Sequence, residues 1–494
     1  MMGSVKKPEI GRKKRILILG AGVMQGPSIR IAGEMGLETV VADADPLASC
    51  VSLASRFEKV DLKDREGIEK LARSLKENGG LDGIMTAGTD FSTTVAWAAE
   101  KLKLPGISFE VALDASDKER MRRRFKAASV PSPDFVIVNG PPGPGFSLPF
   151  PWPVVVKPVD NMGARGCRRV DSQAGLEAAI AEALGFSRSR RVIIEEYMEG
   201  PEFSVDALVY QGEINICGIA DRHIFFPPYF IEMGHTMPSL MEDAVISPIL
   251  ETFCRAVKAL GIINGAAKGD IKLTKKGPMI GEIAARLSGG YMSGWTYPYS
   301  SGVLPAKGAI QIALGEKPGA LDAKWNWTSA ERAFISIPGK VLSIDGVEEA
   351  KVKPWVRDVF TLIKPGSLVK FPENNVTKCG NVISAAPDRQ DAVNAAELAA
   401  KSILIRLEAP NEVTEAFLAA PPGEVTFPPD AFGGSHHFDY VGRSVQESLE
   451  AVRVLTGKTP PFDPPFWRAL SRGGYQGAVY YIDSLMAHTE KEKC

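Results

Sequence analysis

The sequence predicts an α/β fold at the N-terminus, followed by α+β regions, in a chain of several domains. Apolar strand-like segments alternate with helical segments from residue 14 to residue 102, which is the βαβ pattern of a parallel sheet. Residues 268–290 instead indicate an antiparallel β-hairpin around a Lys-Lys-Gly-Pro turn. At 494 residues the chain is too long for a single hydrophobic core.

Composition and charge exclude several classes of protein. The formal net charge of −1 gives no reason to expect nucleic acid or an acidic membrane surface as a partner. The six cysteines have neither the spacing of a zinc site nor that of a disulfide framework, which is typical of reduced thiols. No leader-like or membrane-spanning apolar run is present, so we expect a cytoplasmic protein with no membrane contact.

The N-terminal strand at residues 14–22 ends in a glycine turn that opens a helix of small residues. The next strand ends at Asp43 and Asp45, roughly where a dinucleotide fold places its ribose-binding acid. A nicotinamide-dependent dehydrogenase is therefore one alternative, although any tight strand-to-helix junction needs such a turn. Ligands of parallel sheets bind beyond the carboxyl ends of the strands, so Thr89 and Asp90 are expected to face a substrate.

A capping box at Ser116–Glu119 predicts the start of an amphipathic helix. The arginines at 122–124 are interpreted as the solvated face of this helix rather than as a nucleic-acid patch. We therefore expect no nucleic-acid partner.

Lys157 interrupts an apolar strand, where a lysine normally needs an anionic partner. The loop that follows contains Gly163 and Gly166, whose backbone N–H groups could cover phosphate oxygens. It lacks the P-loop pattern. A second strand then leads into an acidic linker with Glu195, Glu196 and Glu202.

In the hairpin, Asp270 and Glu282 are expected to lie opposite each other on neighbouring strands. Like charges at that distance repel, and a bound cation would reverse the sign of the interaction. Two hard carboxylates suit magnesium. Arg286 and the Ser-Gly-Gly sequence at 288–290 follow, so the stretch predicts a metal–phosphate site; a surface hairpin with solvated charges is the alternative.

In their order along the chain, these motifs resemble the ATP-grasp superfamily, especially its carboxylate–amine ligase branch, with a biotin-carboxylase and carbamoyl-phosphate-synthase-like ATP-binding fold. The resemblance covers residues from about 14 to 405. It implies a pre-ATP-grasp domain at 1–113, an ATP-grasp domain at 114–315 with a mobile lid near 118–195, and a small C-terminal subdomain at 328–408. Residues 410–494 are a C-terminal extension that the resemblance does not cover.

The resemblance implies ATP and Mg²⁺, with Mn²⁺ as a substitute, as cofactors. The residues implied to bind the nucleotide are Lys118 and Lys157, the loop Gly163, Ala164, Arg165 and Gly166, the hinge Glu195, Glu196, Tyr197 and Met198, and Glu202 at the ribose. Glu195 would accept a hydrogen bond from the adenine amino group. Asp270 and Glu282 would hold the metal, although the family's further Asn ligand is replaced by Ala284.

The implied reaction activates a substrate carboxylate as an acyl phosphate and joins it to an amine. Arg286 would stabilise the acyl phosphate, and Lys268 could reach the transferring phosphate. Arg222 and His235 lie where related ligases keep substrate contacts. The expected partners are a small carboxylate and a small amine, and the resemblance is compatible with a homodimer.

Two further alternatives remain open at this point. One is phosphorylation of bicarbonate or carbamate, and the other is a regulatory nucleotide-binding protein with little turnover. The C-terminal subdomain shows no catalytic pattern and is expected to serve packing, with a helix from Asp388 to Leu407. Residues 410–494 are expected to form an oligomer interface or a lid, and His436–His437 is a weak candidate for a metal pair.

Overall fold

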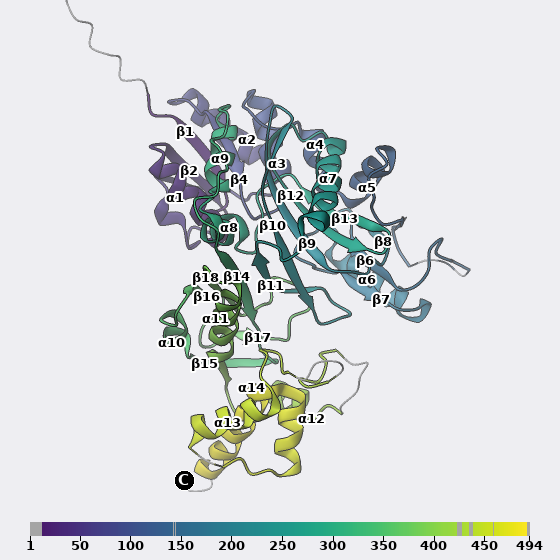
Figure 1. Cartoon of the computed structure of the whole chain (residues 1–494), viewed down its shortest axis with the longest axis vertical. Helices are drawn as coiled ribbons and strands as arrows, with labels where there is room; N and C mark the ends of the chain where they lie inside the picture. Colours follow the sequence, from purple (N-terminus) through teal and green to yellow (C-terminus); the bar gives the residue numbers. More distant parts are fainter. Residues whose placement is uncertain are drawn as a thin grey trace, which may run out of the picture.

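The computed structural model describes residues 12–141, 143, 145–421, 427–433, 438–457 and 459–491. His436 and His437 lie outside the described residues. The chain forms an N-terminal parallel sheet, a lid sheet, a large central sheet and a helical C-terminal region, arranged in space as Figure 1 shows. The predicted fold class, α/β followed by α+β, is confirmed.

The N-terminal sheet is parallel, with strand order β3-β2-β1-β4. Three of its strands are mostly apolar, as expected where helices cover both faces, and the edge strand at 56–59 is polar. The oxygen Oδ2 of Asp43 accepts a hydrogen bond from the backbone of Ala21 at 2.8 Å, so this carboxylate stabilises the glycine turn. The elements are β1 (Arg15–Leu19), α1 (Gly26–Glu34), β2 (Glu38–Asp43), β3 (Arg56–Lys59), α2 (Arg65–Glu77), β4 (Gly83–Thr86) and α3 (Ser92–Leu102).

Two short helices connect this sheet to the lid, α4 (Phe109–Asp114) and α5 (Lys118–Ala127). The predicted capping box is wrong: the N-cap of α5 is Asp117, whose side chain accepts from the backbone of Arg120 at 3.1 Å. The predicted solvated arginine face is also wrong in part. Arg123 is exposed, but Arg122 is fully buried.

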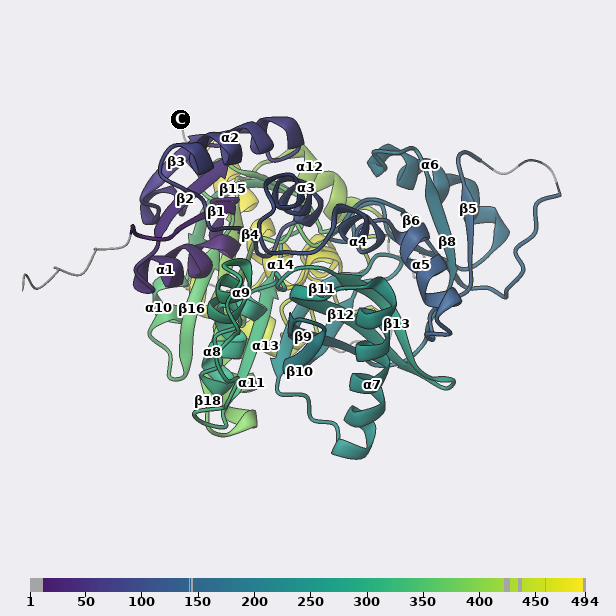
Figure 2. The same ribbon diagram turned by 90° about the horizontal axis from the view of Figure 1, so that it is seen from above.

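The lid is a four-stranded antiparallel sheet with order β5-β8-β6-β7. Helix α6 (Leu176–Phe186) packs against it around Val154, Val156 and Ile194. Seen from above, the lid projects to one side of the rest of the molecule (Figure 2). Its strands are β5 (Phe135–Val138), β6 (Val154–Pro158), β7 (Arg168–Val170) and β8 (Val192–Glu196).

The central sheet has eight strands in the order β13-β12-β9-β10-β11-β14-β18-β16. It runs from the predicted hairpin into the C-terminal region without a break in pairing. Its strands are β9 (Glu202–Tyr210), β10 (Glu213–Phe225), β11 (Ile231–Met237), β12 (Asn264–Thr274), β13 (Gly277–Ala284), β14 (Thr328–Phe334), β16 (Val356–Thr361) and β18 (Gly380–Ala386).

Helix α7 (Asp243–Leu260) covers one face of the central sheet at the hairpin end, where Phe253 and Ile283 share a core. The apolar, small-residue helix α9 (Pro305–Ala313) packs between the central sheet and the N-terminal sheet. The short helices α8 (Tyr297–Ser301) and α10 (Val347–Lys351) complete this part of the chain.

The C-terminal region adds a three-stranded sheet in the order β17-β15-β19. The predicted helix from 388 to 407 is too long: α11 ends at Ser402, and apolar residues 404–407 form a strand because they fill a shared core. The elements are β15 (Gly339–Asp345), β17 (Leu368–Val369), α11 (Arg389–Ser402), β19 (Leu404–Leu407), α12 (Glu412–Ala419), α13 (Val445–Thr456) and α14 (Pro464–Lys491). Among the described residues, no helix has both the length and the apolar character that crossing a bilayer requires.

Candidate functional site

A cavity of about 670 Å³ lies between the lid and the central sheet. Most of the residues singled out from the sequence line it, although they come from distant parts of the chain. Gly166 and Asp90 are not among the lining residues. Those that line it are Thr89, Lys118, Lys157, Gly163, Ala164, Arg165, Glu195, Glu196, Tyr197, Met198, Glu202, Arg222, His235, Lys268, Asp270, Glu282 and Arg286.

The hairpin register pairs Asp270 with Glu282, as the sequence predicted. The cations that balance these acids are side chains of the chain itself. Asp270 contacts Lys268 and lies 2.9 Å from Nη1 of Arg222, and Oε1 of Glu282 lies 3.3 Å from Nζ of Lys118. Burial raises the pKa of Glu282, but Lys118 and the neighbouring lysines outweigh burial and lower this pKa to about 2. Glu282 is therefore a fixed anion at neutral pH.

The donor set fits a magnesium ion that arrives together with phosphate. Within the described part of the chain, no three His, Cys, Asp or Glu side chains are grouped so that they could hold a metal on their own. Magnesium is commonly held by one or two carboxylates, with substrate phosphates and waters completing its shell. Asp270 and Glu282 supply that minimum, and Ala284 adds no ligand.

A buried relay positions Lys157 on β6. Its Nζ lies 2.6 Å from Oε2 of Glu195, and the other oxygen of Glu195 accepts from Nε of Arg122 at 2.8 Å. Arg122 also donates to the carbonyl of Gly281, at 2.6 Å, and so ties α5 to β13. Both oxygens of Glu195 are thus engaged by cations. Glu195 thus holds Lys157 in place, and its expected hydrogen bond with an adenine amino group stays a prediction.

The glycine loop has the backbone conformation that its composition suggested. Gly163, Ala164 and Gly166 all have positive φ, between 57° and 67°. A Cβ on Gly166 would lie 2.8 Å from the ring of Phe186, so this glycine lets the loop pack closely on α6 instead of facing the cavity. Nζ of Lys118 donates to the carbonyl of Asn161 at 2.8 Å, which places this lysine at the start of the loop.

In the hinge between the lid and the central sheet, residues 195–198, some backbone groups already bond to other parts of the protein. The backbone N–H groups of Glu196 and Tyr197 donate to Asp134 and Pro153, at 2.9 and 3.3 Å. Further along, Glu202 contacts Arg222 and lies 3.4 Å from Nζ of Lys272. The hinge therefore combines backbone N–H groups already bonded to protein carbonyls with a carboxylate already balanced by cations.

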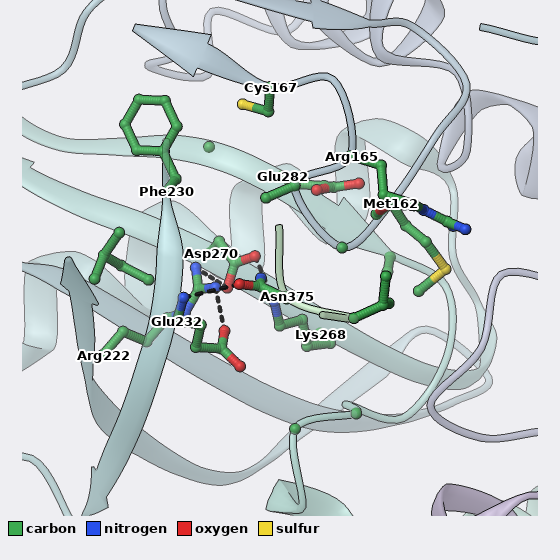
Figure 3. A pocket seen from close by; sticks show the side chains of 18 of the residues that line it. Met162, Arg165, Cys167, Arg222, Phe230, Glu232, Lys268, Asp270, Glu282 and Asn375 are labelled. Atoms are coloured by element: carbon green, nitrogen blue, oxygen red, sulfur yellow. Dashed lines mark hydrogen bonds and ion pairs between the residues drawn. The ribbon is translucent and has the colours of Figure 1, made fainter. Parts of the chain in front are cut away.

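The other end of the cavity holds an alternating chain of buried charges. Arg222 contacts the carboxylates of Glu202, Glu232 and Asp270. Figure 3 shows Arg222, Glu232 and Asp270 close together. His235 lies 3.4 Å from Glu232 and 3.3 Å from Glu331. Arg222, expected to contact substrate directly, therefore also neutralises a carboxylate cluster that includes the candidate metal ligand Asp270.

The loop after β4 meets the loop after β13. Ala87 forms a backbone bridge with Leu287, and the N–H of Gly88 donates to the carbonyl of Leu287 at 3.3 Å. Burial raises the pKa of the next acid, Asp90, while Arg286 and Lys118 counteract that rise. Thr89 and Asp90 thus lie close to Arg286. Thr89 is in the cavity wall, and Asp90 lies behind it.

Several lining residues were missed by sequence reasoning. Glu232 lies in the segment 230–239, which was already expected to contact substrate, so its acidity was an available signal. The loop between β17 and β18 shows no recognisable sequence pattern, and only tertiary packing brings it to the site. The missed lining residues include Glu232, Asn375, Lys378 and Asn381; Arg122 does not line the cavity but contacts Glu195, which does.

Comparison with known families identifies two parts of this chain. Residues 150–294 match the model of the ATP-grasp domain. Residues 333–408 match the model of L-amino acid ligase C-terminal domain 2.

Curated relatives extend these matches. The chain is 26% identical over 239 residues to the L-arginine-specific L-amino acid ligase of Bacillus subtilis, covering 47% of this chain and 58% of that protein. It is 24% identical over 332 residues to carnosine synthase 1 of Gallus gallus, covering 62% of this chain and 36% of that protein. The chain thus spans less than two thirds of the length of either relative.

Among solved structures, an L-amino acid ligase from Bacillus licheniformis superposes with a TM-score of 0.70 at 23% identity. The superposition covers 80% of this chain and 99% of that one. The fold seen around the cavity is therefore shared with that structure.

Proposed function

We propose that this chain, whose ATP-grasp domain places it among the ATP-dependent carboxylate–amine ligases, joins the carboxylate of one amino acid to the amine of another. The observation that carries the proposal is the cavity in which Asp270 and Glu282 face Lys118 and Arg286. The match of residues 333–408 to an L-amino acid ligase domain supports amino acids as the substrate class. The names of the curated relatives point the same way.

In this proposal Asp270 and Glu282 hold Mg²⁺, which when bound neutralises the phosphate charges of ATP. Lys118 and Lys157 bind the phosphates, and Lys157 is kept in position by Glu195. The loop at Gly163 covers the phosphates and excludes water. These roles need positioning and charge, which is what phosphoryl transfer demands of a protein.

The proposed reaction proceeds in two steps. A carboxylate oxygen of the first substrate attacks the γ-phosphorus, and the bond to the β-phosphate oxygen breaks, which gives an acyl phosphate and ADP. The amine nitrogen of the second substrate then attacks the acyl carbon, loses a proton and displaces phosphate. Arg286 stabilises the charge that develops on the acyl phosphate.

A homodimer and a cytoplasmic location stay predictions. The second is supported by the described cysteines, since Cys50, Cys167, Cys217, Cys254 and Cys379 are free thiols.

The decisive experiment measures ADP and phosphate release from the purified full chain with Mg²⁺, over a panel of amino acids used alone and in pairs. We expect release to depend on an amino acid pair and mass spectrometry to detect the condensed product. Lys157→Met is expected to lower kcat/KM by roughly 100-fold or more, as loss of a preorganised charge contact does. The exposed Lys351→Met serves as the matched control, because Lys351 contacts only Glu348 on the surface.

ATP hydrolysis at the same rate with and without the amino acids of the panel would overturn the proposal, and so would full turnover by Lys157→Met. Tight ATP binding without turnover across the panel would favour a regulatory nucleotide-binding protein.

A further inference from the structure

The loop between β17 and β18 enters the cavity from the C-terminal region. The N–H of Asn375 donates to the carbonyl of Gly163 at 2.9 Å, and its Oδ1 accepts from the N–H of Glu232 at 2.8 Å. Figure 3 shows Asn375 beside Glu232 and Asp270. A segment expected to serve packing alone thus forms part of the wall of the site.

Lys378 is a buried lysine in this loop, with 7% of its surface exposed, and it lines the cavity. Its Nζ donates to the carbonyl of Glu232 at 2.7 Å. Within the residues that the structure describes, Lys378 forms no ion pair with a carboxylate. Lysines are rarely buried without a paired anion, because a desolvated ammonium is costly. Nζ has two further N–H groups that a ligand in the cavity can accept from.

Asn381, three residues further on, presents the complementary group. Its Nδ2 donates to Glu331, but its Oδ1 is buried and has no hydrogen-bond partner among the described residues. A buried acceptor without a donor costs free energy. Among the described residues, one wall of the cavity therefore carries a buried ammonium that bonds a carbonyl but forms no ion pair, and a carbonyl oxygen without a hydrogen bond.

The carboxylate that becomes phosphorylated has its own partners elsewhere. It must lie near Asp270, Glu282 and Arg286 on the hairpin. Lys378 is separated from this region by Glu232, since Lys378 binds the carbonyl of Glu232 while the Glu232 carboxylate binds Arg222. An anion at Lys378 is therefore a different group from the one that reacts.

We propose that Lys378 binds the unreacted carboxylate of the amine-bearing substrate and that Asn381 accepts an N–H from the same molecule. Lys378 is then a specificity-determining residue, which selects amines that also carry a carboxylate over simple amines. This inference rests on the proposed ligase function.

The test compares matched acceptors, each L-amino acid against its own L-amino acid amide, which keeps the amine and lacks the carboxylate. Wild-type enzyme should use the acid with a kcat/KM about 10- to 100-fold higher than that for the amide, the effect of one charge-assisted hydrogen bond. Lys378→Met should raise KM for the acid by a similar factor, leaving KM for the amide and for the donor amino acid unchanged. Lys370→Met in the same loop is the matched control, since Lys370 is exposed and contacts only Glu373.

The outcomes separate the two proposals. If no amino acid pair gives ADP and product, the ligase function itself fails. If product forms but wild type uses acid and amide equally, only the role of Lys378 fails, and this comparison stands even if the variant folds poorly. A rise in the donor KM alone would assign Lys378 to the donor and overturn the inference.

Discussion

His235 is held between two buried acids, Glu232 and Glu331. Burial lowers the pKa of His235, but the two carboxylates outweigh burial and raise it above the ordinary value of 6.5. The nearby His223 is not protonated near neutral pH, because burial and Arg332 lower its pKa to about 3. His235 therefore carries more positive charge in the folded protein than an ordinary imidazole does at the same pH.

This charge predicts a pH-dependent contribution to stability. Because the folded-state pKa is raised, the contribution is fully present below pH 6.5 and is lost as pH rises through the folded pKa. The difference in the free energy of unfolding between wild type and His235→Asn should therefore shrink as pH rises. Urea melts over a series kept above about pH 5, where Glu232 stays ionised, would measure it. A difference that stays constant over the series would contradict the prediction.

At the residue scale, sequence reasoning succeeded where the local pattern and the three-dimensional environment agreed. Asp270 and Glu282 were placed opposite each other correctly, but their pairing depends on a register shift between Asp270 and Ile271 that the strand pattern does not contain. Arg122 was misjudged because its neighbours in the run are surface residues, while its own partner, Glu195, lies in another element. The partner of a buried charge is a tertiary fact that a helical pattern does not contain.

The tip of the β10–β11 hairpin holds the lid on the central sheet. The carbonyl of Pro228 accepts from the N–H of Arg169 on β7 at 2.7 Å. The guanidinium of Arg168 lies 5.8 Å from the ring centre of Tyr229, which packs edge-on against Phe427 at 4.6 Å. One tyrosine therefore connects the lid to the C-terminal region.

Removing this ring should loosen the lid. We expect Tyr229→Ala to raise KM for ATP roughly two- to fivefold, the effect of one partly exposed cation–π contact, and to expose the lid to limited proteolysis. Tyr229→Phe is the matched control, because it keeps the ring and removes only the hydroxyl. If Tyr229→Ala and wild type share the same KM and cleavage rate, the tip does not hold the lid.

At the element scale, existence was easier to predict than extent. Strands β1, β2 and β4 were recognisable because their central residues are apolar and buried, whereas the polar edge strand β3 was not predicted. The end of α11 was not predicted correctly, since residues 404–407 would suit a helix locally. They form a strand only because they pair with β15. Similarly, Asp117 and Ser116 are both good caps, and the wider packing decides between them.

The C-terminal helices share a core with the subdomain that precedes them. Phe417, Leu418 and Tyr480 pack in one cluster with Ile337 and Leu407. In addition, Arg406 on β19 makes two bonds to Asp483 on α14, at 2.7 and 2.6 Å. These helices therefore cover a face that would otherwise be exposed and apolar, whatever else they do.

A chain that ends after residue 409 should consequently be damaged as a whole. We expect it to be insoluble or to melt lower by on the order of 10 °C, because large apolar side chains lose their packing partners. Yield of soluble protein and calorimetry would measure this. Val454→Ser, on the exposed face of α13, is the control and should change neither. A truncated chain with unaltered melting would show that the two parts fold independently.

For the whole molecule, the order of motifs indicated the ATP-grasp resemblance, and the family matches confirm it. The contribution of the C-terminal loop to the cavity could not be predicted. No periodicity marks that Asn375, Lys378 and Asn381 line the cavity, because their placement depends on how the eight-stranded sheet continues past the hairpin.

The bond between Asn375 and Gly163 has a consequence for timing. The loop at 370–378 touches the glycine loop and also carries Lys378, so we expect that opening of the lid would uncover the proposed nucleotide and acceptor sites together. An activated intermediate would then be committed to its acceptor before either could leave, and isotope trapping can read out this commitment. A single amide-to-carbonyl contact would in this way set the order of events in each catalytic cycle.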